Sequence, residues 1–519
     1  MPFQLSRRKF LTASATVGAA AAFGGCFTPS ISRAAERPMI THGVQSGDVA
    51  ANSAIVWSRA DRASRMVTEI ATTESFSHSI RMPHVDVLPE RDFAGKLMLN
   101  DLPADRDIFY KIHFENLDDG RARSEPVVGH FRTAPTARRN IRFGWSGDTA
   151  GQGWGIDEDR GGMKTYAAIA AHNPDFFIHS GDTIYADGPF AAEIKMPDGD
   201  IWKNITTEDT AKVAETIDEF RGNYKYNMLD KNVREFNRLI PVYYQWDDHE
   251  VTNNWYPREM LSSDDRYGVK SASLLAARAN RAFRDMMPVT EHVGEPGRIY
   301  RKVSRGPSLE IFLLDMRTYR GPNNANDSPV PTDDTDFLGR AQIEWLKRGL
   351  LNSKATWKVV AADMPIGMIV PDGDNFENLA NGNGAAAGRE LEIVELLRFV
   401  KSAKIRNIVW LTADVHYTAA HYYDPNGARF QDFDPFWEFV SGPLHAGTFG
   451  PNDMDDTFGP RVMFAKHPTR EQGVNLPPSF GLQFFGLVDI DGETERFRVS
   501  LRDVADNELY AVALDPVFG

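Results

Sequence analysis

The sequence is most informative at residues 175–187, which read Asp-Phe-Phe-Ile-His-Ser-Gly-Asp-Thr-Ile-Tyr-Ala-Asp. The first half is a short apolar run typical of a buried strand, and the second half is a polar turn that carries Asp182 and Tyr185. Gly181 allows the backbone to approach this turn closely because glycine has no Cβ. A strand that ends in ionisable side chains is typical of an α/β sheet, where loops from several strands meet at one rim.

Other apolar runs extend this pattern on both sides. They cover residues 141–145, 242–246, 309–314, 357–362 and 407–411. Helical periodicity lies between the runs, for example at 162–171 and 271–287, and residues 481–490 and 495–501 are typical of antiparallel strands. We therefore expect an α/β catalytic domain of layered sheets and helices over residues 137–519.

Ionisable residues follow most of these runs directly. They are Ser146-Gly147-Asp148, Asp247-Asp248-His249-Glu250, Asp363, and Ala413-Asp414-Val415-His416. Each motif alone has an ordinary explanation, since a Gly-Asp pair is commonly a turn and a single histidine commonly lies in a core. Together, carboxylates this close would repel one another unless a cation held them. Carboxylate, phenolate and imidazole ligands suit one trivalent or transition ion beside a harder cation.

The order of the motifs carries a family resemblance. Gly-Asp, Gly-Asp-x-x-Tyr, Asp-His-Glu and Asp-x-His resemble the calcineurin-like metallophosphoesterases, in the form found in PhoD-type alkaline phosphatases. Tyr185, three residues after Asp182, also resembles the purple acid phosphatases. Residues 246–250, 314–320 and 441–443 are similar to PhoD-type hallmarks. The resemblance implies a metallophosphoesterase-type fold and the hydrolysis of phosphoester substrates.

The resemblance also assigns metal ligands by position. It places Asp148, Tyr185 and His416 on a first metal, Asp182 as a bridge, and Asp248, Asp363 and Asp414 on a second metal. Asp247 remains an alternative to Asp248. Oxygen ligands favour Ca²⁺, Mg²⁺ or Mn²⁺ over Zn²⁺, whereas a tyrosinate favours Fe³⁺, and the family implies iron with calcium. Where many PhoD-type enzymes have a cysteine, this chain has Gly147-Asp148, a harder ligand set.

The expected reaction is attack on phosphorus by a metal-activated hydroxide. By analogy with the superfamily, His249 would stabilise or protonate the leaving group, whereas Arg317 and Arg320 could hold phosphate oxygens or form ion pairs. An alkaline phosphatase acting on monoesters is the main expectation. A phosphodiesterase or phospholipase D-like enzyme of the same fold is the alternative, and a non-catalytic periplasmic metal- or carbohydrate-binding protein is a more distant one.

Residues 36–136 predict a separate, small all-β domain before the catalytic one. Short alternating runs such as 53–57 and 108–114 are separated by Asp, Gly and Pro turns. This pattern favours an immunoglobulin- or fibronectin-like sandwich.

Residues 1–35 are expected to be a twin-arginine signal peptide, so the export machinery would be a partner. Arg7-Arg8 precede a small apolar stretch at 13–27, and Ser32-Arg33-Ala34 is a cleavage pattern that would start the mature chain near Ala35. Export would place the protein in the periplasm or outside the cell. Cys26, the only cysteine, lies in this segment, so lipoprotein anchoring is an alternative and disulfides are not expected in the mature chain.

Composition narrows the class of protein further. The 519 residues are 42% hydrophobic and 25% charged, which excludes a largely disordered chain. A net charge of −14 argues against a nucleic-acid-binding surface, which requires a basic stripe. No transmembrane segment is expected in the mature chain, because the apolar stretch in the signal is too short and too rich in Ala and Gly.

Overall fold

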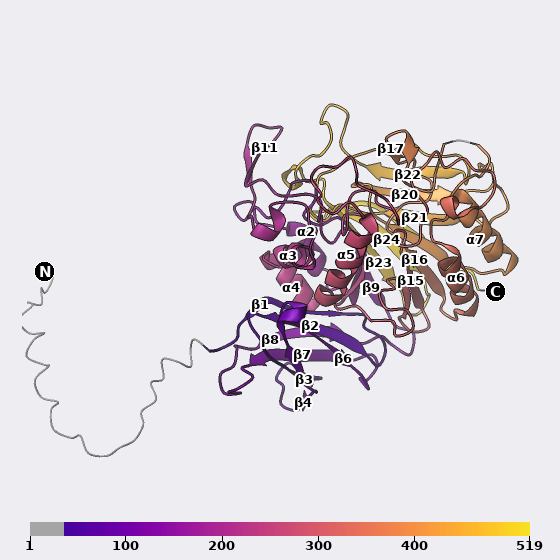
Figure 1. Ribbon diagram of the computed structural model, residues 1–519. Helices are drawn as coiled ribbons and strands as arrows, with labels where there is room; N and C mark the ends of the chain where they lie inside the picture. The colour runs from indigo at the N-terminus through magenta and orange to yellow at the C-terminus, as the bar shows by residue number, and fades with distance from the viewer. Residues whose placement is uncertain (1–35, 383, 519) are drawn as a thin grey trace, which may run out of the picture.

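The computed structural model describes residues 36–382 and 384–518, so the predicted twin-arginine signal, the predicted cleavage site and Cys26 lie outside the described residues. The catalytic part has four layers, with two sheets packed face to face and helices on both outer sides (Figure 1). Between the sheets, Phe143 and Ile178 of one pack in the same core as Val359 and Leu411 of the other. The predicted α/β architecture of layered sheets and helices is confirmed.

The first sheet has nine strands. In spatial order they are β25 (Glu508–Leu514), β24 (Phe497–Asp503), β23 (Phe484–Ile490), β9 (Ile141–Ser146), β10 (Phe176–Ser180), β13 (Val242–Gln245), β1 (Ile40–Gly47), β2 (Ala54–Ala60) and β6 (Ala94–Leu99). The second sheet has seven, β14 (Arg301–Ser304), β15 (Leu309–Leu313), β16 (Trp357–Ala361), β19 (Ile408–Thr412), β21 (Phe436–Val440), β20 (Thr418–Tyr423) and β22 (Pro460–Lys466).

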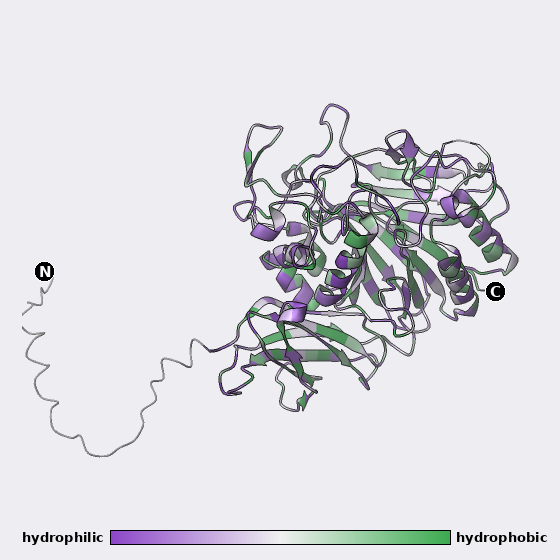
Figure 2. Cartoon of the chain, viewed as in Figure 1, coloured by the Kyte–Doolittle hydropathy of each residue, from purple (hydrophilic) through white to green (hydrophobic). Residues whose placement is uncertain are grey.

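Six α-helices cover the outer faces of the two sheets. They are α2 (Lys164–Ala170), α3 (Ile217–Asn227), α4 (Lys231–Leu239), α5 (Ala272–Met286), α6 (Arg340–Asn352) and α7 (Glu390–Ser402). The first four pack on the nine-stranded sheet and the last two on the seven-stranded sheet. The helical patterns at 162–171 and 271–287 correspond to α2 and α5, which are shorter by one or two residues at each end. Figure 2 shows hydrophobic residues concentrated in the strands and mixed with polar residues on the helices.

The N-terminal part is a sandwich of two antiparallel sheets. Strands β1, β2 and β6 face β4 (Ile80–Arg81), β3 (Ser64–Ala71), β7 (Asp107–Glu115) and β8 (Val127–Arg132), while β5 (Val85–Val87) pairs with β3. The predicted all-β architecture is confirmed. The sequence did not indicate that β1 also pairs in parallel with β13, through Gly47 and Val242, so that one sheet of the sandwich continues into the catalytic sheet.

The remaining elements are short. Two hairpins consist of β11 (Glu193–Lys195) with β12 (Ile201–Lys203) and β17 (Pro371–Asp372) with β18 (Asn375–Phe376). Four 3₁₀ helices are η1 (Pro89–Arg91), η2 (Glu208–Thr210), η3 (Asp333–Thr335) and η4 (Pro478–Phe480). Over the described part of the chain, we find no helix that combines the length and the apolar character needed to cross a membrane.

Parallel strands set the position of the ionisable loops. Strands β9, β10 and β13 are parallel to one another, as are β15, β16, β19 and β21. The predicted strands at the six apolar runs are therefore all present, and their carboxyl ends lie at shared edges of the two sheets. This arrangement brings loops that are distant in the sequence to one rim.

Candidate metal centre

The loops that carry the predicted ligands have an unusual backbone. Asp148, Asp182, Asp414 and His416 all adopt positive φ, at 68°, 51°, 66° and 58°. Residues other than glycine rarely adopt this left-handed conformation, and it costs on the order of 1–3 kcal/mol each. Such strain persists only where the surrounding structure holds it, and it is concentrated at functional sites.

Glycines allow these loops to approach one another. A Cβ on Gly181, which has φ +94°, would lie 2.5 Å from the Cβ of Asp247 on the neighbouring loop. A Cβ on Gly442 would lie 2.1 Å from Oδ2 of Asp148. Both distances are far below van der Waals contact, so the close approach predicted for Gly181 is present.

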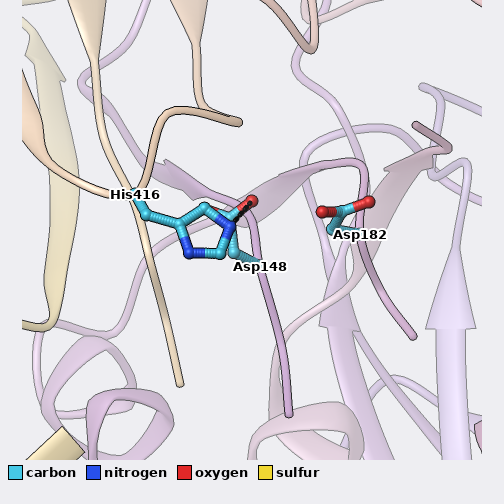
Figure 3. A group of neighbouring side chains, drawn as sticks. All are labelled: Asp148, Asp182 and His416. Carbon is cyan, nitrogen blue, oxygen red and sulfur yellow. Dashed lines mark ion pairs between the residues drawn. The ribbon is translucent and has the colours of Figure 1, made fainter. Parts of the chain in front are cut away.

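The first group of candidate ligands contains Asp148, Asp182 and His416. One ligand atom of each lies within 4.8 Å of the others. Figure 3 shows Asp148 between the other two side chains, and Nε2 of His416 is 3.8 Å from its Oδ1. The hydroxyl of Tyr185 lies 2.7 Å from the same Nε2, so the fourth predicted member of the first site is also in place.

The protonation of His416 suits a metal ligand. Its Nδ1 donates a hydrogen bond of 2.5 Å to the carbonyl of Gly447, so Nε2 is the unprotonated nitrogen, and its lone pair, which faces the Tyr185 hydroxyl, is the one available to a metal. Burial lowers the pKa of His416 to about 4, so the ring is neutral at neutral pH.

Two further groups continue from the first. Asp182, Asp248 and His249 form one, and Asp247, Asp248 and Asp414 form the other, each with ligand atoms within 4.8 Å. Asp182 is thus shared by the first two groups and Asp248 by the last two. His249, predicted to act on the leaving group, therefore also lies where a ligand could lie.

Asp247 differs from Asp248 in its contact with an arginine, and Asp363 differs from both in lying outside the three groups. Oδ1 of Asp247 accepts a 2.5 Å hydrogen bond from Nε of Arg317, whereas Oδ1 of Asp248 has no hydrogen-bond partner among the described residues. Asp363 is fully buried and belongs to none of the three groups. Its Oδ2 is 3.9 Å from Nε of Arg317.

The electrostatics of the centre fit bound cations. Burial, reinforced by neighbouring carboxylates, raises the pKa of four aspartates well above the usual value, namely Asp148, Asp182, Asp363 and Asp414. Buried oxygens of Asp148, Asp247, Asp248 and Asp363 have no hydrogen-bond partner in the described part of the chain. Buried polar atoms are rarely left unpaired, so these oxygens are well suited to hold metal ions.

His249 is held by Asp187, a residue for which the sequence analysis predicts no separate role. Oδ1 of Asp187 is 2.7 Å from its Nδ1, and Oδ2 of Asp187 accepts a hydrogen bond from the backbone of Asn253. Burial alone would lower the pKa of His249, but the negative charges of Asp187 and Asp248 raise it to about 10. Asp187 lies two residues after Tyr185 in the quoted motif, and this position was the only signal for it.

The two arginines considered for phosphate binding contact protein groups instead. Arg317 is fully buried, and its Nη2 lies 2.6 Å from Oε1 of Glu377. Arg320 donates hydrogen bonds to Asn323 and to the carbonyl of Glu377. Glu377 follows the β17–β18 hairpin and is not part of any strand-end motif in the sequence. Nothing in the sequence therefore indicated its contact with these arginines.

A cavity of about 360 Å³ opens over the centre. Its lining includes the candidate ligands Asp182, Asp248, Asp414 and His416, together with the apolar side chains of Phe449 and Pro371. A second cavity of about 390 Å³ lies beside it, lined by Tyr185, Asp187 and Arg266. Gln152, His249 and Asn253 line both, so the two spaces adjoin at His249.

The PhoD-like phosphatase family model matches residues 143–501, which include every candidate ligand. The chain belongs to the PhoD-like phosphatase family. The model of the N-terminal domain of PhoD-like phosphatases matches residues 25–135. Membership of a family of phosphoester hydrolases argues against the expectation of a non-catalytic binding protein.

Known proteins agree with this assignment. The PhoD-like chain is 24% identical over 439 residues to alkaline phosphatase D of Bacillus subtilis (strain 168), which covers 80% of this chain and 71% of the relative. The solved structure of PhoD superposes with a TM-score of 0.67 at 20% identity, covering 92% of this chain and 89% of that one. The purple acid phosphatase PPD1 from yellow lupin (Lupinus luteus) seeds has a TM-score of 0.57 at 12% identity, with coverage of 92% and 74%. These structures share the fold.

Proposed function

We propose that this PhoD-like phosphatase hydrolyses phosphate monoesters at the buried metal centre. The observation that carries the proposal is the chain of ligand groups that joins Tyr185 and His416 to Asp248 and Asp414 in the lining of an open cavity. The relative in Bacillus subtilis is named an alkaline phosphatase, which agrees with this activity.

The two ends of the centre suit different cations. We propose Fe³⁺ beside Asp148, Tyr185 and His416, because burial and the charges of Asp182 and Asp148 raise the pKa of the Tyr185 phenol well above 10, and only a strongly acidic cation would deprotonate it. Asp182 would bridge. We propose Ca²⁺ at the oxygen-only end with Asp248, Asp363 and Asp414, where Mn²⁺ or Mg²⁺ are alternatives. When bound, the cations lower the pKa of water and neutralise charge on the phosphoryl oxygens.

The protein's own residues orient the substrate and move the proton. Asp187 fixes the ring of His249 through Nδ1, so Nε2 is the nitrogen left to face the substrate. Tyr185 packs against the same ring, with centroids 4.2 Å apart. We propose that His249 donates its proton to the departing oxygen, which then leaves as an alcohol. Phe449 and Pro371 add apolar surface to the lining of the cavity over the centre.

Phosphate diesters are the second candidate substrates. The two cavities adjoin at His249, so a phosphorus atom bound over the ligands would have space for an organic group on each side. A monoester needs only one of these spaces.

Metal analysis of the purified protein, beside rates on matched nitrophenyl monoesters and diesters, tests the proposal. We expect two kinds of metal and faster turnover of the monoester. Faster turnover of the diester would assign the second activity instead, and no turnover of either substrate would refute both.

We also propose export and a boundary between two domains. The Arg7-Arg8 motif supports a twin-arginine signal over residues 1–35, and hence a periplasmic or secreted protein. The proposed boundary separates a sandwich domain at 36–136 from a catalytic domain at 137–519. Replacing both arginines by lysine should retain the chain in the cytoplasm. Unchanged export in a cell fractionation assay would contradict the signal.

A further inference from the structure

Glu250 contacts the backbone of two ligand loops of the metal centre but belongs to none of the three ligand groups. It follows His249 directly and is fully buried. Its carboxylate accepts three backbone N–H groups. Oε1 accepts one from Thr183 at 2.6 Å, while Oε2 accepts one from Asp182 at 3.1 Å and one from Asp247 at 2.7 Å.

The three amides belong to two different ligand loops. Strands β10 and β13 pair in parallel as far as Ser180 and Gln245, where their ladder ends. Asp182 and Thr183 lie just beyond the first strand end, and Asp247 lies just beyond the second. The carboxylate of Glu250 therefore joins the two loops where the backbone ladder no longer does.

Other links between these loops lie further along the chain from the strand ends, and they include the Asp187 carboxylate, which contacts His249 and Asn253. The amide of His249 donates to Oδ1 of Asp182 at 3.2 Å, and the amide of Ala186 donates to the carbonyl of His249 at 2.8 Å. Within the described chain, the Glu250 carboxylate is the group that accepts backbone N–H groups from both loops next to the strand ends. Its two oxygens fix the separation of the backbone at Asp182 from the backbone at Asp247, and hence the place of Asp248.

We propose that Glu250 is a positioning residue that sets the spacing between Asp182 and Asp248 and thereby the cation affinity of the site they share. The inference rests on the proposed metal centre but not on the identity of the substrate. Hydrogen bonds from N–H groups to a carboxylate are stronger and more directional than those to neutral acceptors. Residues that orient metal ligands in this way typically change metal affinity by about 10–100-fold when they are replaced.

Glu250→Gln is the informative substitution because it keeps the shape of the side chain. Glutamine has one acceptor oxygen and one NH₂ donor. In either orientation, the NH₂ group would face at least one of the three backbone N–H donors. An NH₂ in place of Oε1 deprives Thr183 of its acceptor, and an NH₂ in place of Oε2 deprives Asp182 and Asp247 of theirs. In either case the loop after β10 loses one of its two hydrogen bonds, while the volume of the side chain is retained.

Glu392 offers a matched control. Its carboxylate also accepts three backbone N–H groups, from Phe337, Leu338 and Gly339, which precede or begin α6. None of these residues belongs to a ligand group. Glu392→Gln therefore makes the same chemical change on the same number of amides without touching a ligand loop.

The test is a titration of metal-stripped full-length protein with Mn²⁺, in which electron paramagnetic resonance measures the concentration of free Mn²⁺ at each step. We expect Glu250→Gln to lower Mn²⁺ affinity by about 10–100-fold and Glu392→Gln to leave it unchanged, although both variants lose thermal stability without metal. Equal Mn²⁺ affinity in Glu250→Gln and the parent protein would overturn the inference.

A second variant covers the case in which Glu250→Gln does not fold. Glu250→Asp keeps the charge but shortens the side chain by one methylene, so it cannot reach both loops, and we expect the same loss of Mn²⁺ affinity. Unchanged affinity in this variant would equally overturn the inference. Failure of the parent protein to bind Mn²⁺ would instead count against the proposed metal centre.

Discussion

Replacing His249 by alanine tests the proposed proton donor most directly. The structure fixes the ring through the 2.7 Å contact between Nδ1 and Asp187, and Nε2 lies 3.9 Å from Oδ2 of Asp248. A proton donor held in this way contributes about 10²–10⁴-fold to the rate. At 1.36 kcal/mol for each factor of ten, this equals about 2.7–5.4 kcal/mol of the barrier.

The expected loss depends on the leaving group. A phosphate ester of an alkyl alcohol has a high-pKa leaving group and needs the proton, so its kcat/KM should fall by the full 10²–10⁴-fold. Nitrophenolate leaves without a proton, so kcat/KM for a nitrophenyl ester should fall by less than about tenfold. Asp187→Asn, which keeps the shape but removes the charge beside Nδ1, should give a smaller loss with the same dependence on leaving group.

The assay compares kcat/KM for both ester types with the metal content of each variant. His172→Ala is a suitable control, because His172 also has a carboxylate at 2.7 Å, from Asp506, but belongs to no ligand group. Equal losses on both esters would refute proton donation and indicate phosphate positioning. Loss of bound metal would show that His249 is a ligand, as its proximity to Asp182 and Asp248 allows.

Three further outcomes are expected. Chelation should abolish activity, and full recovery should require two kinds of metal, since one end of the centre has a phenol and an imidazole and the other only carboxylates; full activity in stripped protein would contradict this. Tyr185→Phe should remove any phenolate-to-metal absorption band and sharply lower the turnover rate without unfolding, and an unchanged visible spectrum would assign Tyr185 to the core. Gly181→Ala should weaken metal binding and lower the free energy of unfolding by about 1–3 kcal/mol, because φ there is +94° and the new Cβ would meet Asp247; metal titration and thermal melts measure both.

Local pattern was enough to place most of the candidate ligands. Asp148, Asp182, Asp414 and His416 each follow a buried parallel strand within a few residues, and parallel strands bring their carboxyl ends together whatever the loops do later. The same logic correctly gave the six strands and the two helices at 164–170 and 272–286.

Contacts between residues that are distant in the sequence could not be predicted from local pattern. Asp187 and His249 are 62 residues apart in the sequence, and only the folded chain shows that they form a pair. Glu377 follows a short hairpin that has no helical or strand periodicity in its sequence, so its contact with Arg317 left no sequence signal. The continuation of the sandwich into the catalytic sheet depends on one residue pair, Gly47 with Val242, which is too short to leave a pattern.

The charge balance around Arg317 explains why two adjacent aspartates, Asp247 and Asp248, have different surroundings. Its guanidinium lies 2.5 Å from Oδ1 of Asp247 and 3.6 Å from Oδ1 of Asp248. Asp247 therefore holds the arginine through Oδ1, whereas its Oδ2 and Oδ1 of Asp248 have no hydrogen-bond partner in the described structure. The positive charges of His249 and Arg317 outweigh the effect of burial and lower the pKa of Asp248 to about 2, which keeps this carboxylate ionised.

One guanidinium cannot neutralise the carboxylates that surround it. Besides Asp247 and Asp248, it lies within 4.0 Å of Glu377, Asp363 and Asp414. Repulsion on this scale leaves two outcomes at neutral pH, protonation of some carboxyl groups or binding of cations. A cation relieves the repulsion and offers a partner to several of the unpaired oxygens at once, whereas a proton pairs only the two oxygens that share it. The buried arginine thus reduces the negative charge at this end of the centre without removing the need for a metal.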